Sequence, residues 1–220
     1  MTTLLETVRV RQGSAPLWAL HRVRLARSAA ALGLVVPPSL EAPTGGADRV
    51  VRLALGAEGL AVASRDVGST APVRLQVVRV PHPGYRHKTT DRAIFDAARA
   101  EAQAAGADDA LLLAPDGTVA ETAIWALGWW EPDGLHFPAL AIGVLPSVGR
   151  ARLTELGPVH DGALTPSALA RRAVLVVNAV RGVVPVQNLS GEELPADPRT
   201  EALQARFWPV PGEGFGSGGS

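Results

Sequence analysis

The sequence PHPGYRHKTTDRAIFDAARAEAQA, residues 81–104, contains the most informative position in the chain. Its proline and glycine residues interrupt the strand-like pattern before it, and apolar residues at helical spacing follow from Asp91 to Ala105. The stretch in between therefore predicts an extended crossing from one part of the fold to the next. Lys88 lies in this crossing, and it is the only lysine in the chain.

The isolation of Lys88 makes it a candidate for chemistry. The chain has 21 basic residues, and all except Lys88 are arginine. Arginine supplies charge and hydrogen bonds but keeps its proton, whereas lysine can become a neutral amine nucleophile. A general bias of the composition toward arginine, with Lys88 as a surface residue without a function, would give the same count. The role of Lys88 therefore depends on the motifs around it.

The segment before the crossing predicts a small lobe of mixed helix and strand over residues 1–80. Residues 4–11 alternate and are β-branched, which is typical of a strand. Apolar residues at helical spacing predict a helix from Pro16 to Leu34, with Gly33 as its C-terminal cap. Three more strands are expected, over residues 50–55, 60–65 and 73–80.

The segment after the crossing predicts a second lobe over residues 81–190. A strand is expected over residues 109–114, then a Pro-Asp-Gly turn and a second strand that runs through Trp130. Two β-branched runs near the end of this lobe predict its final core strands. Residues 191–220 are expected to form a tail whose Gly/Ser-rich end is disordered.

Two helix starts are expected in the second lobe. Pro146 suits the N-terminus of a helix, where free N–H groups and the positive end of the dipole favour a phosphate. Thr165 suits the N-cap of a later helix, and Pro166 suits its first turn. Together these patterns predict an α/β or α+β fold.

Composition excludes several function classes. The 21 basic and 21 acidic residues cancel, so no overall field attracts nucleic acid or an anionic membrane, and no local basic patch is evident in the sequence. The absence of cysteine excludes a disulfide framework and a thiol nucleophile. No apolar run is long enough for a membrane span and no signal sequence is evident, so a cytoplasmic location and a small-molecule substrate are expected.

Six motifs in this order resemble the class IV aminotransferases, the fold-type IV enzymes that use pyridoxal 5′-phosphate. The resemblance implies two small α/β lobes with the cofactor in the cleft between them, and a homodimer. The motifs are LLETVRV (4–10), HRVRL (21–25), HKTTDRAIFDAARAEA (87–102), DDALLLAPDGTVAET (108–122), GVLPSVGRARL (143–153) and VVNAVRGVVPV (176–186).

The resemblance also implies roles for individual residues. Lys88 would carry the cofactor as a Schiff base, pass it to the substrate amine as an external aldimine, and then remove the proton from the amine-bearing carbon. Glu121 would pair with the pyridine nitrogen of the cofactor, and Arg24 would contact its phosphate. His21 and His87 are expected to be structural, and the role of Tyr85 is open.

Backbone N–H groups in two loops would bind the phosphate of the cofactor. The resemblance assigns this role to Val148 and Gly149 in the first loop, and to Ala179 and Val180 in the second. The chain departs from the family at Gly149, where threonine is usual. It departs again at Ala126, where asparagine is common, and three tryptophans crowd the same region: Trp125, Trp129 and Trp130.

The compact length, the HKTT tetrapeptide and the ending NAVRGVVPV resemble the 4-amino-4-deoxychorismate lyase-like members, which serve folate biosynthesis. The first expectation is therefore a lyase that releases pyruvate and forms 4-aminobenzoate. An aminotransferase acting on branched-chain or D-amino acids would share every cofactor motif. A catalytically degenerate relative is the third possibility, because of the departures at Gly149 and Ala126.

Overall fold

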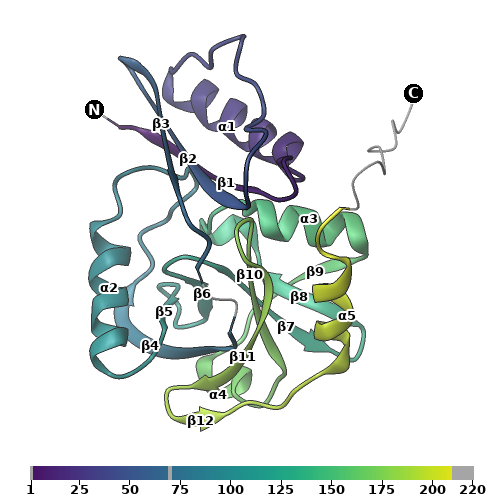
Figure 1. Ribbon diagram of the computed structural model, residues 1–220. Coiled ribbons are helices and arrows are strands. Elements are labelled where there is room, and N and C mark those ends of the chain that lie inside the picture. The colour runs from purple at the N-terminus through teal and green to yellow at the C-terminus, as the bar shows by residue number, and fades with distance from the viewer. Residues whose placement is uncertain (1, 69–70, 210–220) are drawn as a thin grey trace.

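A three-stranded antiparallel sheet begins the fold in the computed structural model, which describes residues 2–68 and 71–209. Helix α1 covers one face of this small sheet (Figure 1). Leu4 and Leu55 of the sheet pack there against Leu25 and Ala29 of the helix. The elements are β1 (Leu4–Val10), α1 (Trp18–Leu32), β2 (Arg49–Gly56) and β3 (Gly59–Arg65), and the strand order is β1-β2-β3.

A nine-stranded mixed sheet forms the larger part of the fold, in the order β6-β5-β4-β11-β10-β7-β8-β9, with β12 paired to β11. Strand β4 runs parallel to both of its neighbours, and β8 runs parallel to β9. The strands are β4 (Val73–Pro81), β5 (Asp109–Leu113), β6 (Val119–Thr122), β7 (Ala126–Glu131), β8 (Gly134–Pro138), β9 (Val159–Gly162), β10 (Val174–Asn178), β11 (Gly182–Leu189) and β12 (Glu192–Glu193).

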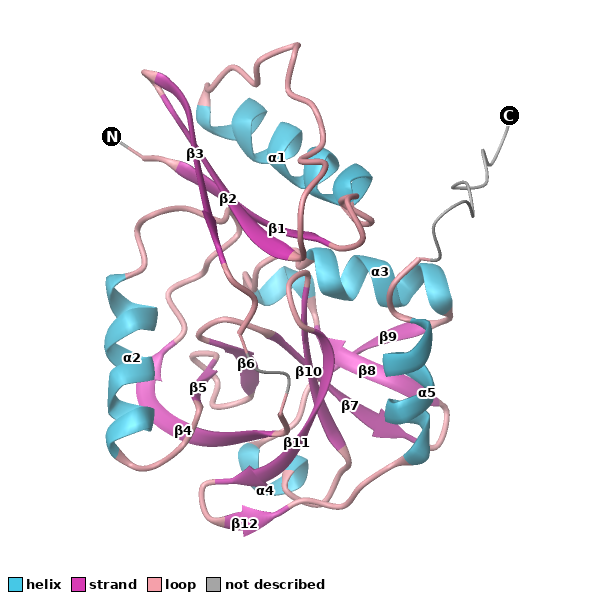
Figure 2. Cartoon of the chain, in the orientation of Figure 1, coloured by secondary structure: helices cyan, strands magenta, loops and turns pink. Residues whose placement is uncertain are grey.

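Helices cover both faces of the large sheet (Figure 2). Alternation along β10 shows why: Val176 packs in one core with Leu169 of α4, whereas Leu175 packs in another core with Leu153 of α3. The helices are α2 (Ala93–Ala104), α3 (Val148–Leu156), α4 (Pro166–Leu169) and α5 (Pro198–Arg206), with a 3₁₀ turn, η1, over Leu140–Ile142.

Several expected boundaries are confirmed by local geometry. Gly33 ends α1 in the left-handed conformation, with φ of 65°. The hydroxyl of Thr165 caps α4 by accepting from the N–H of Ala168. The strand expected to run through Trp130 is instead two strands, β6 and β7. The chain turns between them because the Thr122 hydroxyl accepts the N–H of Trp125 at 3.0 Å.

Five elements were not expected from the sequence, two of them the short η1 turn and β12. Strands β8 and β9 extend the large sheet, and helix α5 lies inside the segment interpreted as a tail. Phe207, just after α5, is completely buried in the core with α3 and β10. The Gly/Ser-rich end that was expected to be disordered falls largely on residues 210–220, which lie outside the described residues.

The change from the small to the large sheet occurs between Arg65 and Val73, because β4 belongs to the large sheet. The lobe boundary expected after residue 80 therefore lies one strand later than the change of sheet. The division into lobes over residues 1–80 and 81–190 stays a prediction. Within residues 2–68 and 71–209, no helix has the length and apolar character needed to cross a membrane.

Candidate active site

A cavity of about 350 Å³ lies between the two sheets. On the small sheet its wall is the face turned away from α1. Thr7, Arg52 and Arg65 lie on that face, because alternate residues of each strand point to opposite sides. The opposite wall comes from the crossing segment, helix α2, the β6–β7 turn, the start of α3 and the β10–β11 turn.

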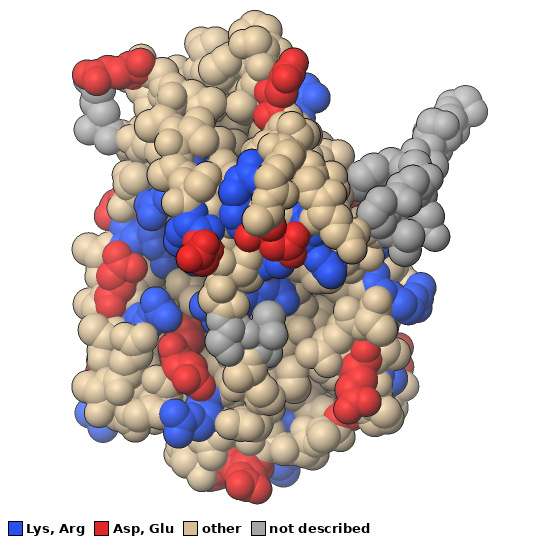
Figure 3. All heavy atoms as spheres, in the orientation of Figure 1, with Lys and Arg blue, Asp and Glu red and all other residues tan. Residues whose placement is uncertain are grey.

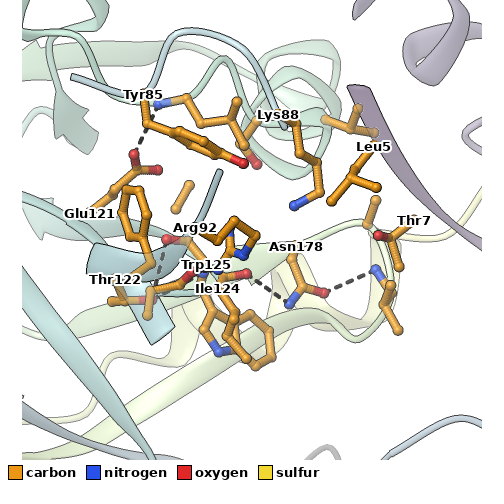
Figure 4. A pocket seen from close by; sticks show the side chains of 18 of the residues that line it. Leu5, Thr7, Tyr85, Lys88, Arg92, Glu121, Thr122, Ile124, Trp125 and Asn178 are labelled. Carbon is orange, nitrogen blue, oxygen red and sulfur yellow. Dashed lines mark hydrogen bonds between the residues drawn. The ribbon is translucent and has the colours of Figure 1, made fainter. Parts of the chain in front are cut away.

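Strand β1 fixes the backbone around Lys88. The N–H of Leu5 donates to the carbonyl of Lys88 at 2.7 Å, and the N–H of Thr90 donates to the carbonyl of Thr3 at 2.9 Å. These two bonds add the crossing segment to the edge of the small sheet. The side chain of Lys88 then points into the cavity, toward the space between Glu121 and Asn178 (Figure 4).

Tyr85 closes the loop that precedes Lys88. Its hydroxyl accepts the N–H of Thr89 and donates to the carbonyl of Thr89, both at 2.7 Å. Its own N–H donates to the carbonyl of Gly143 at 2.7 Å. The open role of Tyr85 is thus filled in part, because its hydroxyl holds the main chain beside the lysine.

The amine of Lys88 is poised to react. In the described part of the chain, no ion pair or hydrogen bond involves its Nζ atom, which faces the cavity. Burial lowers the pKa of Lys88 to about 8, and the charges of Arg24 and Arg92 act in the same direction. At pH 7 roughly a tenth of the amine is therefore neutral and nucleophilic.

Glu121 presents one carboxylate oxygen to the cavity and binds the protein with the other. Oε1 accepts from Nε2 of His82 at 2.7 Å and from the N–H of Leu145 at 3.1 Å. Both Glu121 and His82 are buried. No hydrogen bond among the described residues involves Oε2, so this oxygen is available to a ligand. His82 was not singled out by the sequence.

Arg24 lines the cavity but is held by Glu6, a residue that sequence reasoning did not single out. Its Nε donates to one carboxylate oxygen of Glu6 at 2.9 Å, and its Nη2 donates to the other at 2.5 Å. Nδ1 of His21 lies 2.6 Å from the same carboxylate. Contact between Arg24 and a phosphate stays a prediction, with Nη1 directed at the start of α3, 3.5 Å from the carbonyl of Pro146.

The buried carboxylate of Glu6 is ionised in this network. Burial raises its pKa, but the charge of Arg24 and the hydrogen bonds from His21 and Arg24 outweigh burial and bring the value down to about 2. Burial lowers the pKa of His21, which keeps that ring neutral. His21 is thus a buried hydrogen-bonding residue of the helix, as expected.

Two of the four predicted phosphate donors are already used by the protein. The N–H of Gly149 donates to the hydroxyl of Ser147 at 3.1 Å, and the N–H of Val180 donates to Oδ1 of Asn178 at 2.9 Å. The N–H groups of Val148 and Ala179 have no acceptor among the described residues, and both residues line the cavity. Gly149 does not line it. The free donors are therefore one in each loop.

The departure at Gly149 has a packing cause. A Cβ atom at this position would lie 2.7 Å from Cγ2 of Val177 and 3.1 Å from the backbone of Asn178. Helix α3 therefore sits too close to β10 for threonine. At the other departure, Ala126 lines the cavity at the start of β7. The three tryptophans differ in position: Trp125 lines the cavity, whereas Trp129 and Trp130 do not.

His87 points away from the cavity, as adjacent residues of an extended segment should. Its Nδ1 atom lies 3.1 Å from the hydroxyl of Ser28 on α1. The contact joins the crossing segment to the first helix, which agrees with a structural residue.

The cavity wall is strongly basic, although the net charge of the chain is zero. Lys and Arg atoms gather across the middle of the face shown in Figure 3, below the small sheet. Seven lining residues are basic: Arg24, Arg52, Arg65, Lys88, Arg92, Arg99 and Arg181. Only Asp96 and Glu121 are acidic among the lining residues. Sequence reasoning missed this patch because its members come from four separate segments.

The chain belongs to the class IV aminotransferase family. The family's sequence profile, described as amino-transferase class IV, matches residues 61–189, more than half of the chain. A search of curated proteins gave no match.

Solved structures share the fold. A Legionella pneumophila protein, provisionally described as a 4-amino-4-deoxychorismate lyase, is 23% identical, with a TM-score of 0.82 over 93% of this chain and 91% of that chain. A branched-chain aminotransferase from Thermoproteus uzoniensis is 21% identical, with a TM-score of 0.81 over 93% and 84%. A hypothetical aminotransferase from Mycobacterium tuberculosis, in its PLP-bound form, is 19% identical, with a TM-score of 0.81 over 93% and 87%. The expected fold-type IV architecture is confirmed.

Enzymes of this family use pyridoxal 5′-phosphate, and the residues of the cavity fit it. The cofactor needs an amine, an acid for its ring nitrogen and donors for its phosphate. The cavity offers the unpaired Nζ of Lys88 and the unpaired Oε2 of Glu121. It also offers the free N–H groups of Val148 and Ala179 and the guanidinium of Arg24, which all line it.

Proposed function

We propose that this chain is a pyridoxal-phosphate-dependent lyase that converts 4-amino-4-deoxychorismate to 4-aminobenzoate and pyruvate, a step of folate biosynthesis. The observation that carries the proposal is the unpaired amine of Lys88 in a cavity with seven basic and two acidic lining residues. Aminodeoxychorismate carries two carboxylates, so its charge complements these walls. A branched-chain amino acid carries one carboxylate and an apolar side chain, and it matches them less well.

In this proposal the residues divide the binding of the cofactor among them. Lys88 holds it covalently through Nζ, and Oε2 of Glu121 pairs with the protonated ring nitrogen. The N–H groups of Val148 and Ala179, with Arg24, bind the phosphate. Gly149 and Val180 support those two loops from within, because their own N–H groups bond to Ser147 and Asn178.

The chemistry depends on proton transfer at Lys88. When bound, pyridoxal phosphate supplies an electron-withdrawing ring next to the amine-bearing carbon. Once the amine of the substrate has replaced it on the cofactor, the freed Nζ of Lys88 would take the proton from that carbon. The electron pair would form a ring double bond, and the carbon–oxygen bond would break with its electron pair going to the leaving enolpyruvate, which takes up a proton to become pyruvate. Formation of the aromatic ring drives the step.

The test is to incubate the cofactor-loaded protein with aminodeoxychorismate and to measure both products, beside Lys88→Arg. Equal amounts of 4-aminobenzoate and pyruvate from the wild type, with neither from the variant, are expected. Keto acid formation from branched-chain or D-amino acids, without pyruvate release, would identify an aminotransferase instead. If no product forms with any of these substrates, the chain has the fold of the family but is catalytically inactive. The proposed homodimer is checked separately by sedimentation.

A further inference from the structure

Three arginines of the cavity wall have no acidic partner. Among the ion pairs of residues 2–68 and 71–209, Arg24 is paired with Glu6, Arg92 with Asp96, and Arg99 with Asp109. The remaining arginines of the cavity, which take part in no ion pair there, are Arg52, Arg65 and Arg181. Positive charges gathered without counter-charges repel each other, so this arrangement favours an anionic ligand.

Two of the three come from the small sheet. In the register of β2 and β3, Arg52 pairs with Ala63 and Val50 pairs with Arg65, so both arginines point from the same face of the sheet. That face carries Thr7 and Leu5 into the cavity as well. Neither arginine is buried in the core, so its charge remains available at the cavity mouth.

Arg181 meets them from the β10–β11 turn on the large sheet. A Cβ atom added to Gly68, three residues after Arg65, would lie 3.4 Å from Nη2 of Arg181. Burial lowers the pKa of Arg181, and the charges of Arg99 and Arg65 lower it further, against the smaller opposing effect of Asp109 and Asp108. The guanidinium of Arg181 lies 5.1 Å from the centre of the Trp125 ring, which holds it in place.

We propose that Arg52, Arg65 and Arg181 form a carboxylate-binding subsite for an acidic group of the substrate remote from its reacting amine. The inference rests on the proposed function, since it describes substrate recognition in the same cavity. Of the groups expected at the cofactor phosphate, Val148 and Arg24 belong to other segments, whereas Ala179 lies in the same β10–β11 turn as Arg181. The subsite selects substrates with a second carboxylate, and its two arginines on the small sheet, Arg52 and Arg65, are separate from the groups expected at the cofactor phosphate.

The test uses isothermal titration of the cofactor-loaded protein with isophthalate and with benzoate, which differ by one carboxylate. The variants are Arg52→Gln, Arg65→Gln and Arg181→Gln, with the exposed Arg22→Gln as the matched control. Each subsite variant is expected to lose about tenfold of the preference for isophthalate over benzoate. Arg22→Gln should keep that preference, and thermal unfolding of each variant verifies that it is folded.

Three outcomes overturn the subsite. The first is an unchanged preference in all three folded variants, and the second is a wild type without any preference for isophthalate. The third is weaker binding of pyridoxal phosphate itself, which would assign the arginines to the cofactor. Failure of the proposed function is distinguishable, because loss of the preference in a protein that releases no pyruvate would leave the subsite standing and remove the lyase assignment.

Discussion

Nε2 of His82 donates a hydrogen bond of 2.7 Å to Oε1 of Glu121. The direction follows from the other ring nitrogen, because Nδ1 of His82 accepts the N–H of Gly84 at 3.2 Å and so carries no proton in this arrangement. The ring is then neutral with its hydrogen on Nε2. Glu121 is held by one of its oxygens while the other faces the cavity, which fixes the orientation of the carboxylate.

His82→Leu should release this carboxylate. Without this donor, only the N–H of Leu145 holds Oε1, so Glu121 can rotate more freely, and we expect the affinity for pyridoxal phosphate to fall by about tenfold. A visible absorption band that reports protonation of the ring nitrogen should shift as well. His82→Gln, whose amide can donate in the same place, should recover most of both properties, and His160→Gln is a control away from the cavity. Equal losses in the Leu and Gln variants would contradict the positioning role.

Lys88→Arg removes the only lysine side chain from the protein. After incubation with pyridoxal phosphate and reduction with borohydride, the wild type should retain one cofactor by intact mass. The variant keeps the positive charge but has no side-chain amine, so it should retain none. Attachment to the variant could come only from its amino terminus, which peptide mapping would reveal.

The rate of that attachment should rise with pH. Because the pKa of Lys88 is lowered to about 8, the neutral fraction of the amine increases about fivefold from pH 7 to pH 8, nearly doubles again by about pH 9 and levels off above that. Stopped-flow absorbance across this range measures it. A rate that keeps rising to pH 10 would show that the lysine has its ordinary basicity.

Glu6 should make stability depend on pH in acid. Its folded-state pKa of about 2 is below the unfolded value of 4.5, so its contribution is full above about pH 4.5 and is lost as the pH falls toward 2. Linkage gives roughly 3 kcal/mol for this contribution. The difference in unfolding free energy between the wild type and Glu6→Gln should shrink by this amount, as measured with urea at several pH values. The exposed Glu192→Gln should show no such convergence.

Gly149→Ala should destabilise the protein by about 1–3 kcal/mol, because its methyl group meets the side chain of Val177 and the backbone of Asn178. Gly157→Ala is the matched control at the other end of α3. Its φ of 169° is extended, and nothing lies within 4 Å of the added Cβ. Urea unfolding of both variants compares them, and an unchanged Gly149→Ala midpoint would mean that α3 moves away from β10 at little cost.

The sequence was sufficient for the features that depend on short stretches. The end of the strand-like pattern at Pro83 and Gly84, the cap at Thr165 and the helix after Asp91 each depend on residues that lie close together in the sequence. Lys88 stood out because it is the only lysine, and the motif order led to the family. These signals are local or compositional, so a reading along the chain can detect them.

Features that depend on distant pairing were missed. Strand β9 pairs in parallel with β8 across α3, and nothing within either short strand specifies that partner. From the sequence alone, Glu6 has the pattern of an exposed residue of a strand. In the fold, α1 places His21 and Arg24 against its carboxylate. The basic lining of the cavity was missed for the same reason. A net charge of zero does not show where in the fold the charged residues lie close together.

The main-chain bond between Leu5 and Lys88 joins β1 to the backbone of the residue that bears the reactive nitrogen. A protease that clipped only the first few residues would touch neither the cavity wall of the large sheet nor the arginines. It would nevertheless remove the hydrogen bonds that hold the crossing segment around Lys88 against β1. An intact β1 is thus a condition of reactivity at Lys88.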